Sequence, residues 1–409
     1  MLDVEQKYQP QALPSELIEE IIAVAANSGP TPREVSQFLA AGSLVSRIWN
    51  IFCRPYIFHT ITISFRDANA RLSFLHFQAP YLSQHIRTLD LHFWPSHRFL
   101  AEEWLPECLG RLTNLRVLRF EPERSFNLLR APALLTAGIM TILFAPHLRK
   151  LVLRGWTFVT DASDLLSMLS PTLEELVIWD VSVRDAAGKG STTIRLEALR
   201  SLGLINVSHP LLGFGNFFEC PNLQSLVARW PRFHEWDVPL WLPDSLSELR
   251  LRATHECNIP NFERVVKPSI VVIDLGSHDS FLPLFTWSTD CINRLPFPNS
   301  IQRLTLNIER NFLVQGHTEG PYPEVSDYTL LARCLRQLVE LGALRSINLN
   351  IKVVEVLPTS DDLAIDEPRE LAKLKIGFAA LLEANVLNVD LVLQGSEDGD
   401  LGTAAYFSL

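Results

Sequence analysis

The chain has 409 residues, of which 47% are hydrophobic and 20% are charged, and its formal net charge is −10. A chain of this composition can bury a large core, which excludes overall disorder. The excess of acidic side chains argues against a general binder of nucleic acid or of anionic membranes, although local patches can differ.

The cysteines and the N-terminal residues bear on the cellular compartment. The cysteines are scattered, at Cys53, Cys108, Cys220, Cys257, Cys291 and Cys334. None approaches Cys-x-x-Cys spacing, which predicts free buried thiols in a reducing compartment, with no zinc site or disulfide framework. Residues 1–12, a flexible N-terminus, are unlike a secretory signal, and no apolar run reaches the roughly 18 residues that span a bilayer. We expect a soluble intracellular protein, cytoplasmic, nuclear or both.

Residues 13–63 predict short helices with strongly apolar faces. The first opens at Leu13-Pro14-Ser15-Glu16-Leu17 and carries one apolar stripe at 17, 18, 21, 22 and 25 before Asn27 to Pro30 end it. The second begins with a capping box at Thr31 and Glu34, with Pro32 at the first helical position. A third helix runs from Leu44 and ends by Pro55.

These residues resemble an F-box. The resemblance covers about 13–60 and rests on Leu13-Pro14-x-Glu16-Leu17, Leu44-Val45-Ser46-Arg47-x-Trp49 and Tyr56-Ile-Phe58. It implies a three-helix module that docks on a Skp-type adaptor and, through it, on a cullin ubiquitin-ligase scaffold. The positions that it places against the adaptor or around its groove are Leu13, Pro14, Leu17, Ile21, Ile22, Leu44, Val45 and Trp49.

The residue pattern is compatible with a partner for these helices. Three short helices within about 40 residues cannot bury stripes this apolar among themselves, so part of the apolar surface needs another protein. The alternative is that the helices only cap the exposed first strand of the array that follows.

A repeated Leu-x-x-Leu-x-Leu pattern, with Ile, Val or Phe allowed, recurs down nearly the whole chain from Phe58 onward. Its last two apolar positions face one side of a strand, and the residues between them face the other. From Leu148 to Ile270 the copies recur within the roughly 20–29-residue period of leucine-rich repeats, which they resemble. The spacing later stretches to about 31, 43 and 42 residues. The copies start at Phe58, Ile86, Leu115, Leu148, Leu173, Leu199, Leu223, Leu246, Ile270, Ile301, Leu344 and Val386.

The connectors are expected to vary. Short helices are predicted over 99–112, 133–144 and 162–169, longer ones over 326–341 and 366–384, an extended stretch over 231–243, and a long loop over 310–325. The family's usual Asn, three residues past the last Leu, is replaced by Trp94, Trp156, Val181, Val207 and Thr254. We therefore expect packing, and not an Asn ladder, to hold an irregular array.

The predicted fold class is an α/β solenoid. An N-terminal three-helix F-box-like module (13–63) is followed by an irregular leucine-rich-repeat horseshoe (64–395) with a parallel sheet on its concave face, and by a C-terminal tail (396–409). No domain boundary is expected inside the array, because stacked repeats share one continuous core.

Candidate chemistry in the sequence is weak. The run from Gly188 to Thr192 resembles a phosphate loop, but Lys189 is followed by Gly190 and the preceding glycine spacing is wrong. The pairs His255/Cys257 and His92/His97 have no second pair at zinc spacing. We therefore expect no enzyme activity, no metal and no cofactor.

The outward positions of the strands carry many basic side chains. An acidic protein with such a face could recognise carboxylates or a phosphorylated segment through bidentate Arg hydrogen bonds. The alternative is that Glu121, Glu175, Glu248 and Asp274 on neighbouring strands neutralise the row and leave a solvated face. The candidate target-binding residues are Arg119, Lys150, Arg154, Trp179, Arg229, Arg250, Arg252 and Arg303.

The F-box and repeat resemblances together imply a substrate-recognition subunit of a Skp-cullin-F-box ubiquitin ligase, active in ubiquitin-dependent protein degradation. The expected partners are the adaptor, through it a cullin, and a protein target bound by the array, with no nucleic acid and no membrane. The protein itself would catalyse no bond change; it would bring a lysine of the target close to a charged conjugating enzyme. The alternative is a leucine-rich-repeat scaffold that binds a protein without ligase association.

Overall fold

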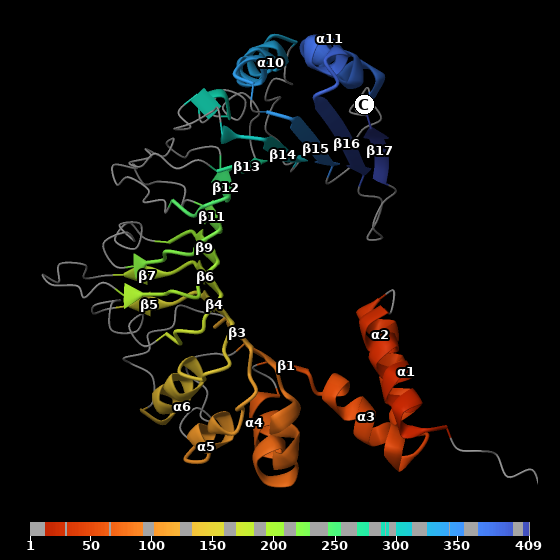
Figure 1. Cartoon of the computed structure of the whole chain (residues 1–409), viewed down its shortest axis with the longest axis vertical. Coiled ribbons are helices and arrows are strands. Elements are labelled where there is room, and N and C mark those ends of the chain that lie inside the picture. Colours follow the sequence, from red (N-terminus) through yellow and green to blue (C-terminus); the bar gives the residue numbers. More distant parts are fainter. Residues whose placement is uncertain are drawn as a thin grey trace, which may run out of the picture. The chain divides into compact units, whose positions relative to one another are not determined.

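A computed structural model (Figure 1) describes most of the chain as two compact units. The first unit comprises Met1–Arg124 and Ala131–Leu148, and the second comprises Ser125–Arg130 and Arg149–Leu409. The described residues are 13–28, 31–64, 67–92, 102–122, 133–158, 169–183, 194–207, 218–229, 244–254, 268–277, 288–290, 292–293, 300–312, 325–342, 344–355, 367–395 and 404–408.

The first unit opens with helices α1 (Ser15–Ser28), α2 (Pro32–Ser43) and α3 (Arg47–Ile57). Thr31 is the N-cap of α2, as predicted: its hydroxyl accepts the Glu34 N–H at 3.3 Å. The Glu34 carboxylate accepts a hydrogen bond from the Thr31 hydroxyl at 2.8 Å, and not from the Thr31 N–H as in the standard capping box. Within this helical region Ile18, Ile22, Leu39 and Cys53 form a buried cluster.

The third helix starts later and ends later than its sequence predicts. Ser46 is its N-cap, accepting the Trp49 N–H at 3.3 Å, so Leu44 and Val45 lie in the turn before it. Pro55 lies inside the helix, although it lacks the N–H that a helical residue donates. The helix continues past it, and the Phe58 N–H bonds the Arg54 carbonyl at 3.0 Å.

The rest of the first unit alternates parallel strands with short helices. Strands β1, β2 and β3 are in register through Ile61, Leu89 and Leu118, as the repeat predicts. The helical turns between residues 68 and 85 were not predicted. The elements are β1 (Thr60–Ile63), α4 (Ala68–Ser73), the π-helix η1 (Phe74–Gln78), the 3₁₀-helix η2 (Pro80–His85), β2 (Thr88–Leu91), α5 (Leu105–Gly110), β3 (Val117–Phe120) and α6 (Ala133–Leu143).

In the second unit, strands β4, β6, β9, β11, β12, β13, β14, β15 and β16 pair in this order, all parallel, and β17 pairs antiparallel with β16. These strands are β4 (Lys150–Arg154), β6 (Glu175–Trp179), β9 (Ser201–Ile205), β11 (Ser225–Arg229), β12 (Glu248–Thr254), β13 (Ile270–Ser277), β14 (Arg303–Phe312), β15 (Ser346–Glu355), β16 (Leu387–Gly395) and β17 (Ala404–Ser408).

The second unit also contains short strand pairs and two long helices. Strand β5 (Thr157–Phe158) pairs with β7 (Ser182–Val183), and β10 (Phe218–Glu219) pairs with β8 (Ile194–Arg195). Helices α10 (Val325–Glu340) and α11 (Glu367–Glu383) lie near the predicted bounds. Strand β17 lies within the expected tail and was not foreseen.

The register of β13 and β16 differs from the predicted repeat by two residues. Val271, and not Ile273, lies opposite Leu249, and Leu387, and not Val389, lies opposite Ile347. A slip of two residues keeps the same side chains on the buried face, so the apolar pattern alone could not distinguish the two registers.

A turn with the same geometry follows successive strands. Gly155, Asp180 and Asn206 each have a positive φ, of 68°, 51° and 52°, and their N–H groups bond the next strand at 2.7–2.8 Å. Gly, Asp and Asn are the residues that tolerate this conformation best. The next residues, Trp156, Val181 and Val207, are at most 1% exposed. Buried apolar side chains thus stand at the positions where the repeat pattern usually carries Asn.

The chain therefore has an N-terminal helical region followed by parallel strands with helices, and the second unit is an open, solenoid-like α/β arrangement (Figure 1). No described helix is long and apolar enough to cross a membrane. The predictions on residues 94, 97, 99–101, 162–168, 188–192, 231–243, 255–257, 291, 313–324, 366 and 396–400 lie outside the described residues.

Candidate interaction surfaces

Helix α1 has apolar side chains on two sides. Ile18 and Ile22 are 4% and 0% exposed in the helical core, whereas Leu17 and Ile21 are 45% and 42% exposed. Each pair is spaced by four residues, so each follows its own side of the helix. The sequence placed all four in one stripe, and the structure divides this stripe between the core and the solvent.

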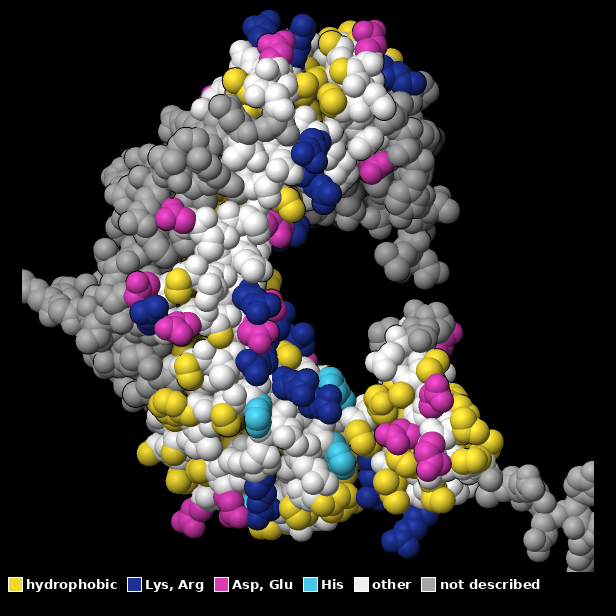
Figure 2. Space-filling model, in the orientation of Figure 1, with side chains coloured by type: hydrophobic (Ala, Val, Ile, Leu, Met, Phe, Trp, Pro, Cys, Tyr) yellow, Lys and Arg dark blue, Asp and Glu magenta, His cyan; other side chains and the backbone are white. Residues whose placement is uncertain are grey.

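The turn before α3 and the start of α3 carry further exposed apolar side chains. Leu44 is 86% exposed and Val45 is 66% exposed, and Ile48 and Ile51 are about half exposed. Figure 2 shows apolar side chains gathered over α1–α3, with acidic side chains among them. We give the name apolar helix surface to the exposed large apolar residues within 13–24 and 44–51; they are Leu13, Leu17, Ile21, Val24, Leu44, Val45, Ile48 and Ile51.

The structure separates the residues that the F-box resemblance placed against an adaptor. Leu13, Pro14, Leu17, Ile21, Leu44 and Val45 are exposed. Ile22 lies in the core, and Trp49 packs partly against the core, beside Gly42, so neither offers a full side chain to a partner. Three members of the surface, Val24, Ile48 and Ile51, were not predicted, although helical spacing from Leu17, Leu44 and Val45 would have found them.

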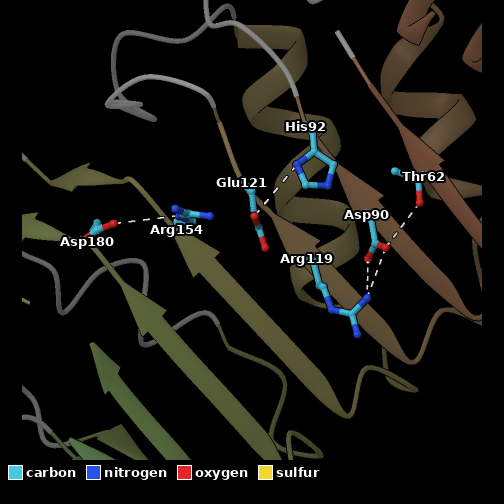
Figure 3. A network of polar contacts seen from close by, with 7 residues as sticks. All are labelled: Thr62, Asp90, His92, Arg119, Glu121, Arg154 and Asp180. Carbon is cyan, nitrogen blue, oxygen red and sulfur yellow. Dashed lines mark hydrogen bonds and ion pairs between the residues drawn. The ribbon is translucent and has the colours of Figure 1, made fainter. Parts of the chain in front are cut away.

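On the sheet of the first unit, the predicted base Arg119 is held by an acid on the neighbouring strand. Its Nη1 donates to both carboxylate oxygens of Asp90, at 3.0 and 3.2 Å, and the Thr62 hydroxyl reaches the same carboxylate at 3.5 Å (Figure 3). His92 faces Glu121, with 4.0 Å between Nδ1 and Oε2. On this face of the sheet, Arg119 and His92 therefore each lie against an acidic side chain of a neighbouring strand.

The second unit shows the same pairing at three further predicted bases. Lys150 Nζ on β4 donates to Glu175 Oε1 on the neighbouring strand β6 at 2.6 Å. The guanidinium group of Arg154 stacks over the Trp179 ring, with 4.4 Å between Cζ and the ring centroid. Arg154 Nε also lies 3.9 Å from Asp180 Oδ2 (Figure 3).

Arg250 makes the most directed of these contacts. Its Nε and Nη2 donate to the two oxygens of Asp274, at 2.5 and 3.2 Å, and this hydrogen bonding raises the pKa of Arg250. Such partly exposed pairs contribute about 0–1 kcal/mol each. Their acids Glu175 and Asp274 are two of the four proposed as neutralising partners.

A ladder of side-chain amides continues from Asp274. Asn307 Nδ2 donates to Asp274 Oδ1 at 2.6 Å, and Asn350 Nδ2 donates to Asn307 Oδ1 at 2.7 Å. In the adjacent row, Asn388 Nδ2 donates to Asn348 Oδ1 at 3.1 Å. This ladder was not predicted from the sequence, because it depends on which distant strands become neighbours.

The remaining predicted bases lie on β11, β12 and β14. Arg229 and Arg252 are register partners on β11 and β12, where Arg250 and the partly buried Glu248 also lie. Arg252 and Arg303 are exposed. Arg119 belongs to the first unit, so the structure does not gather all these bases into one row.

The described cysteines are free and buried: Cys53, Cys108, Cys220 and Cys334. Burial raises the pKa of Cys108 and Cys334 to about 11 and that of Cys220 to about 12, so these thiols remain protonated at neutral pH. The described part of the chain contains no group of three or more His, Cys, Asp or Glu side chains suited to a metal ion.

No model of a known protein family matches the sequence, and no curated protein matches it either.

Proposed function

We propose that the chain is the substrate-recognition subunit of a Skp-cullin-F-box ubiquitin ligase, with the apolar helix surface as the docking site for the adaptor. The observation that carries the proposal is the exposure of large aliphatic side chains on α1 and before α3, on helices whose own core is already filled. Contiguous exposed apolar patches on soluble proteins mark interaction sites.

The sequence motif and this surface support each other. Leu17, Leu44 and Val45 match the F-box pattern and are exposed. If the helices served only to cap a strand, the capping side chains would be covered. Full burial of one Leu is worth about 1.5–3 kcal/mol. Burial of several such side chains would contribute favourably to adaptor binding and offset part of the translational and rotational freedom that association removes.

In this proposal the target binds the outward face of the parallel sheet. The ion pairs and the amide ladder leave little free charge on much of this face. Recognition there would depend on shape and on exchange of these hydrogen bonds. A repeat scaffold without ligase association uses the same sheet face, and only adaptor binding distinguishes the two functions.

Co-purification with a Skp-type adaptor tests the proposal. The tagged full-length chain should retain the adaptor, and the Leu17→Glu/Leu44→Glu variant should lose it, because each change places a charge in the docking surface. The matched control is Leu330→Glu/Ile376→Glu, which alters exposed apolar side chains of α10 and α11, 42% and 64% exposed, in the second unit.

The control variant should bind the adaptor like the wild type. If the wild-type chain retains no adaptor while its circular dichroism shows it folded, the ligase assignment fails and the scaffold remains.

A further inference from the structure

A second surface of the first unit consists of basic side chains at the starts of neighbouring strands; in one of them, His59, Nδ1 lies 3.3 Å from the Thr60 hydroxyl. His59, Arg87 and Arg116 each precede a strand, at the starts of β1, β2 and β3. Their backbones are joined directly: the Arg87 N–H bonds the His59 carbonyl at 2.9 Å, and the Arg116 N–H bonds the Arg87 carbonyl at 2.8 Å. Neighbouring strands are about 4.8 Å apart, so three basic side chains start from adjacent positions. We call these residues the basic edge.

The basic edge differs from the rows beside it. Arg119 forms an ion pair with Asp90, and His92 lies 4.0 Å from Glu121. Within the described residues, neither Arg87 nor Arg116 forms an ion pair or a side-chain hydrogen bond. Both side chains are exposed. Figure 2 shows basic and His side chains gathered near the strands of this unit. Two exposed arginines thus start from adjacent strand positions without an ion pair among the described residues, in a chain whose net charge is −10.

The pKa values of two histidines in this region are lowered, each mainly by burial. Burial lowers the pKa of His59, and the positive charges of Arg87 and Arg116 lower it further. The pKa of His85, which ends η2, is lowered by burial and then by Arg54 of α3. An anion bound at the basic edge would reverse the electrostatic part of the His59 shift.

We propose that the basic edge binds an acidic segment of a partner protein, a run of Asp and Glu side chains. Two adjacent guanidinium groups suit carboxylates, which they bind with paired, charge-assisted hydrogen bonds. Basic side chains over about 10 Å match a short peptide, whereas a nucleic acid needs a longer basic surface. The proposal does not depend on adaptor docking, because none of these residues belongs to the apolar helix surface.

Fluorescence anisotropy with the folded full-length chain tests this site. The probe is a labelled Glu-rich peptide, and the comparison peptide has Gln in place of every Glu. The Glu peptide should bind and the Gln peptide should not. Binding should weaken between about 50 and 300 mM NaCl, because exposed charges are screened.

The Arg87→Glu/Arg116→Glu variant should weaken binding of the Glu peptide by at least about tenfold. The matched control, Arg33→Glu/Arg47→Glu, makes the same change in net charge at exposed arginines of α2 and α3 and should change binding less than twofold.

Equal losses in the two variants would overturn the proposal, because the effect would then come from net charge alone. Competition by millimolar inorganic phosphate would also overturn it and indicate a simple anion site, and tighter binding of a labelled single-stranded RNA would indicate a nucleic-acid site. Retention of the adaptor by the Arg87→Glu/Arg116→Glu variant distinguishes failure here from failure of the proposed ligase function.

Discussion

The outward side chains of the first unit's helices differ from those of the second unit's sheet: many of the former are apolar and exposed, whereas many of the latter are polar and bonded to each other. On α1 and before α3, large apolar residues such as Leu17 and Leu44 face solvent beside a core that is already filled. On the sheet, Lys150, Arg250 and Asn307 are bound to side chains of neighbouring strands. The helices thus offer unused apolar surface, whereas a ligand of the sheet must compete with existing contacts.

The division of α1 between core and surface gives the largest expected effect. Ile22→Ala should destabilise the helical region by about 2–5 kcal/mol, since Ile22 is fully buried. Leu44→Ala, at an 86% exposed position, should change stability by no more than about 0.5 kcal/mol. Hydrogen exchange of α1–α3 amides measures both. Similar protection losses in the two variants would show that Leu44 also packs in the core.

The packing of α11 on α10 can be tested at a residue without a side chain. A Cβ at Gly377 would lie 2.5 Å from the Cβ of Tyr328, on the facing helix. Gly377→Val should therefore destabilise the second unit by about 1–3 kcal/mol, although it raises helix propensity. Urea denaturation followed by circular dichroism is the measurement. The matched control is Gly110→Val at the end of α5, where the closest atom lies at 3.6 Å. An unchanged or raised midpoint for the Gly377 variant would contradict close helix contact.

The amide ladder should contribute less. Asn307→Ala removes the donor to Asp274 and the acceptor for Asn350, and it should cost about 1–2 kcal/mol. Asn388→Ala, in the exposed adjacent row, should cost less because its side chain loses a single hydrogen bond, the 3.1 Å bond that Asn388 donates to Asn348. Equal losses in urea midpoint for the two variants would show that the ladder adds nothing beyond single hydrogen bonds.

The sequence predicted individual helices and strands better than it predicted the register in which the strands pair. The capping box at Thr31 and the apolar spacing of α10 give these helices near their observed bounds, because caps and helical period are properties of neighbouring residues. The register of β13 was wrong by two residues, since alternation fixes a face and not a pairing. Of the candidate surface, Leu17 and Ile22 looked equivalent in sequence, and only packing against Leu39 and Cys53 distinguishes them.

The smallest expected effect concerns the basic edge, where the sheet of the first unit departs from the paired rows of the second. Burial is the main cause of the lowered pKa of His59, and Arg87 and Arg116 add to it. Arg87→Gln/Arg116→Gln should therefore raise this pKa without returning it to the ordinary value. Because the folded state resists protonation of His59, its contribution to stability is lost as pH falls below about 6.5, and the variant should lose less.

NMR titration of the His59 ring protons measures the pKa directly. Arg33→Gln/Arg47→Gln is the control and should leave the His59 titration unchanged, since both arginines lie on other elements. If the basic-edge variant titrates like the wild type, the guanidinium groups of Arg87 and Arg116 do not act on His59. They would then be too dispersed in solvent to hold a carboxylate between them, and the acidic segment would have no site at this edge.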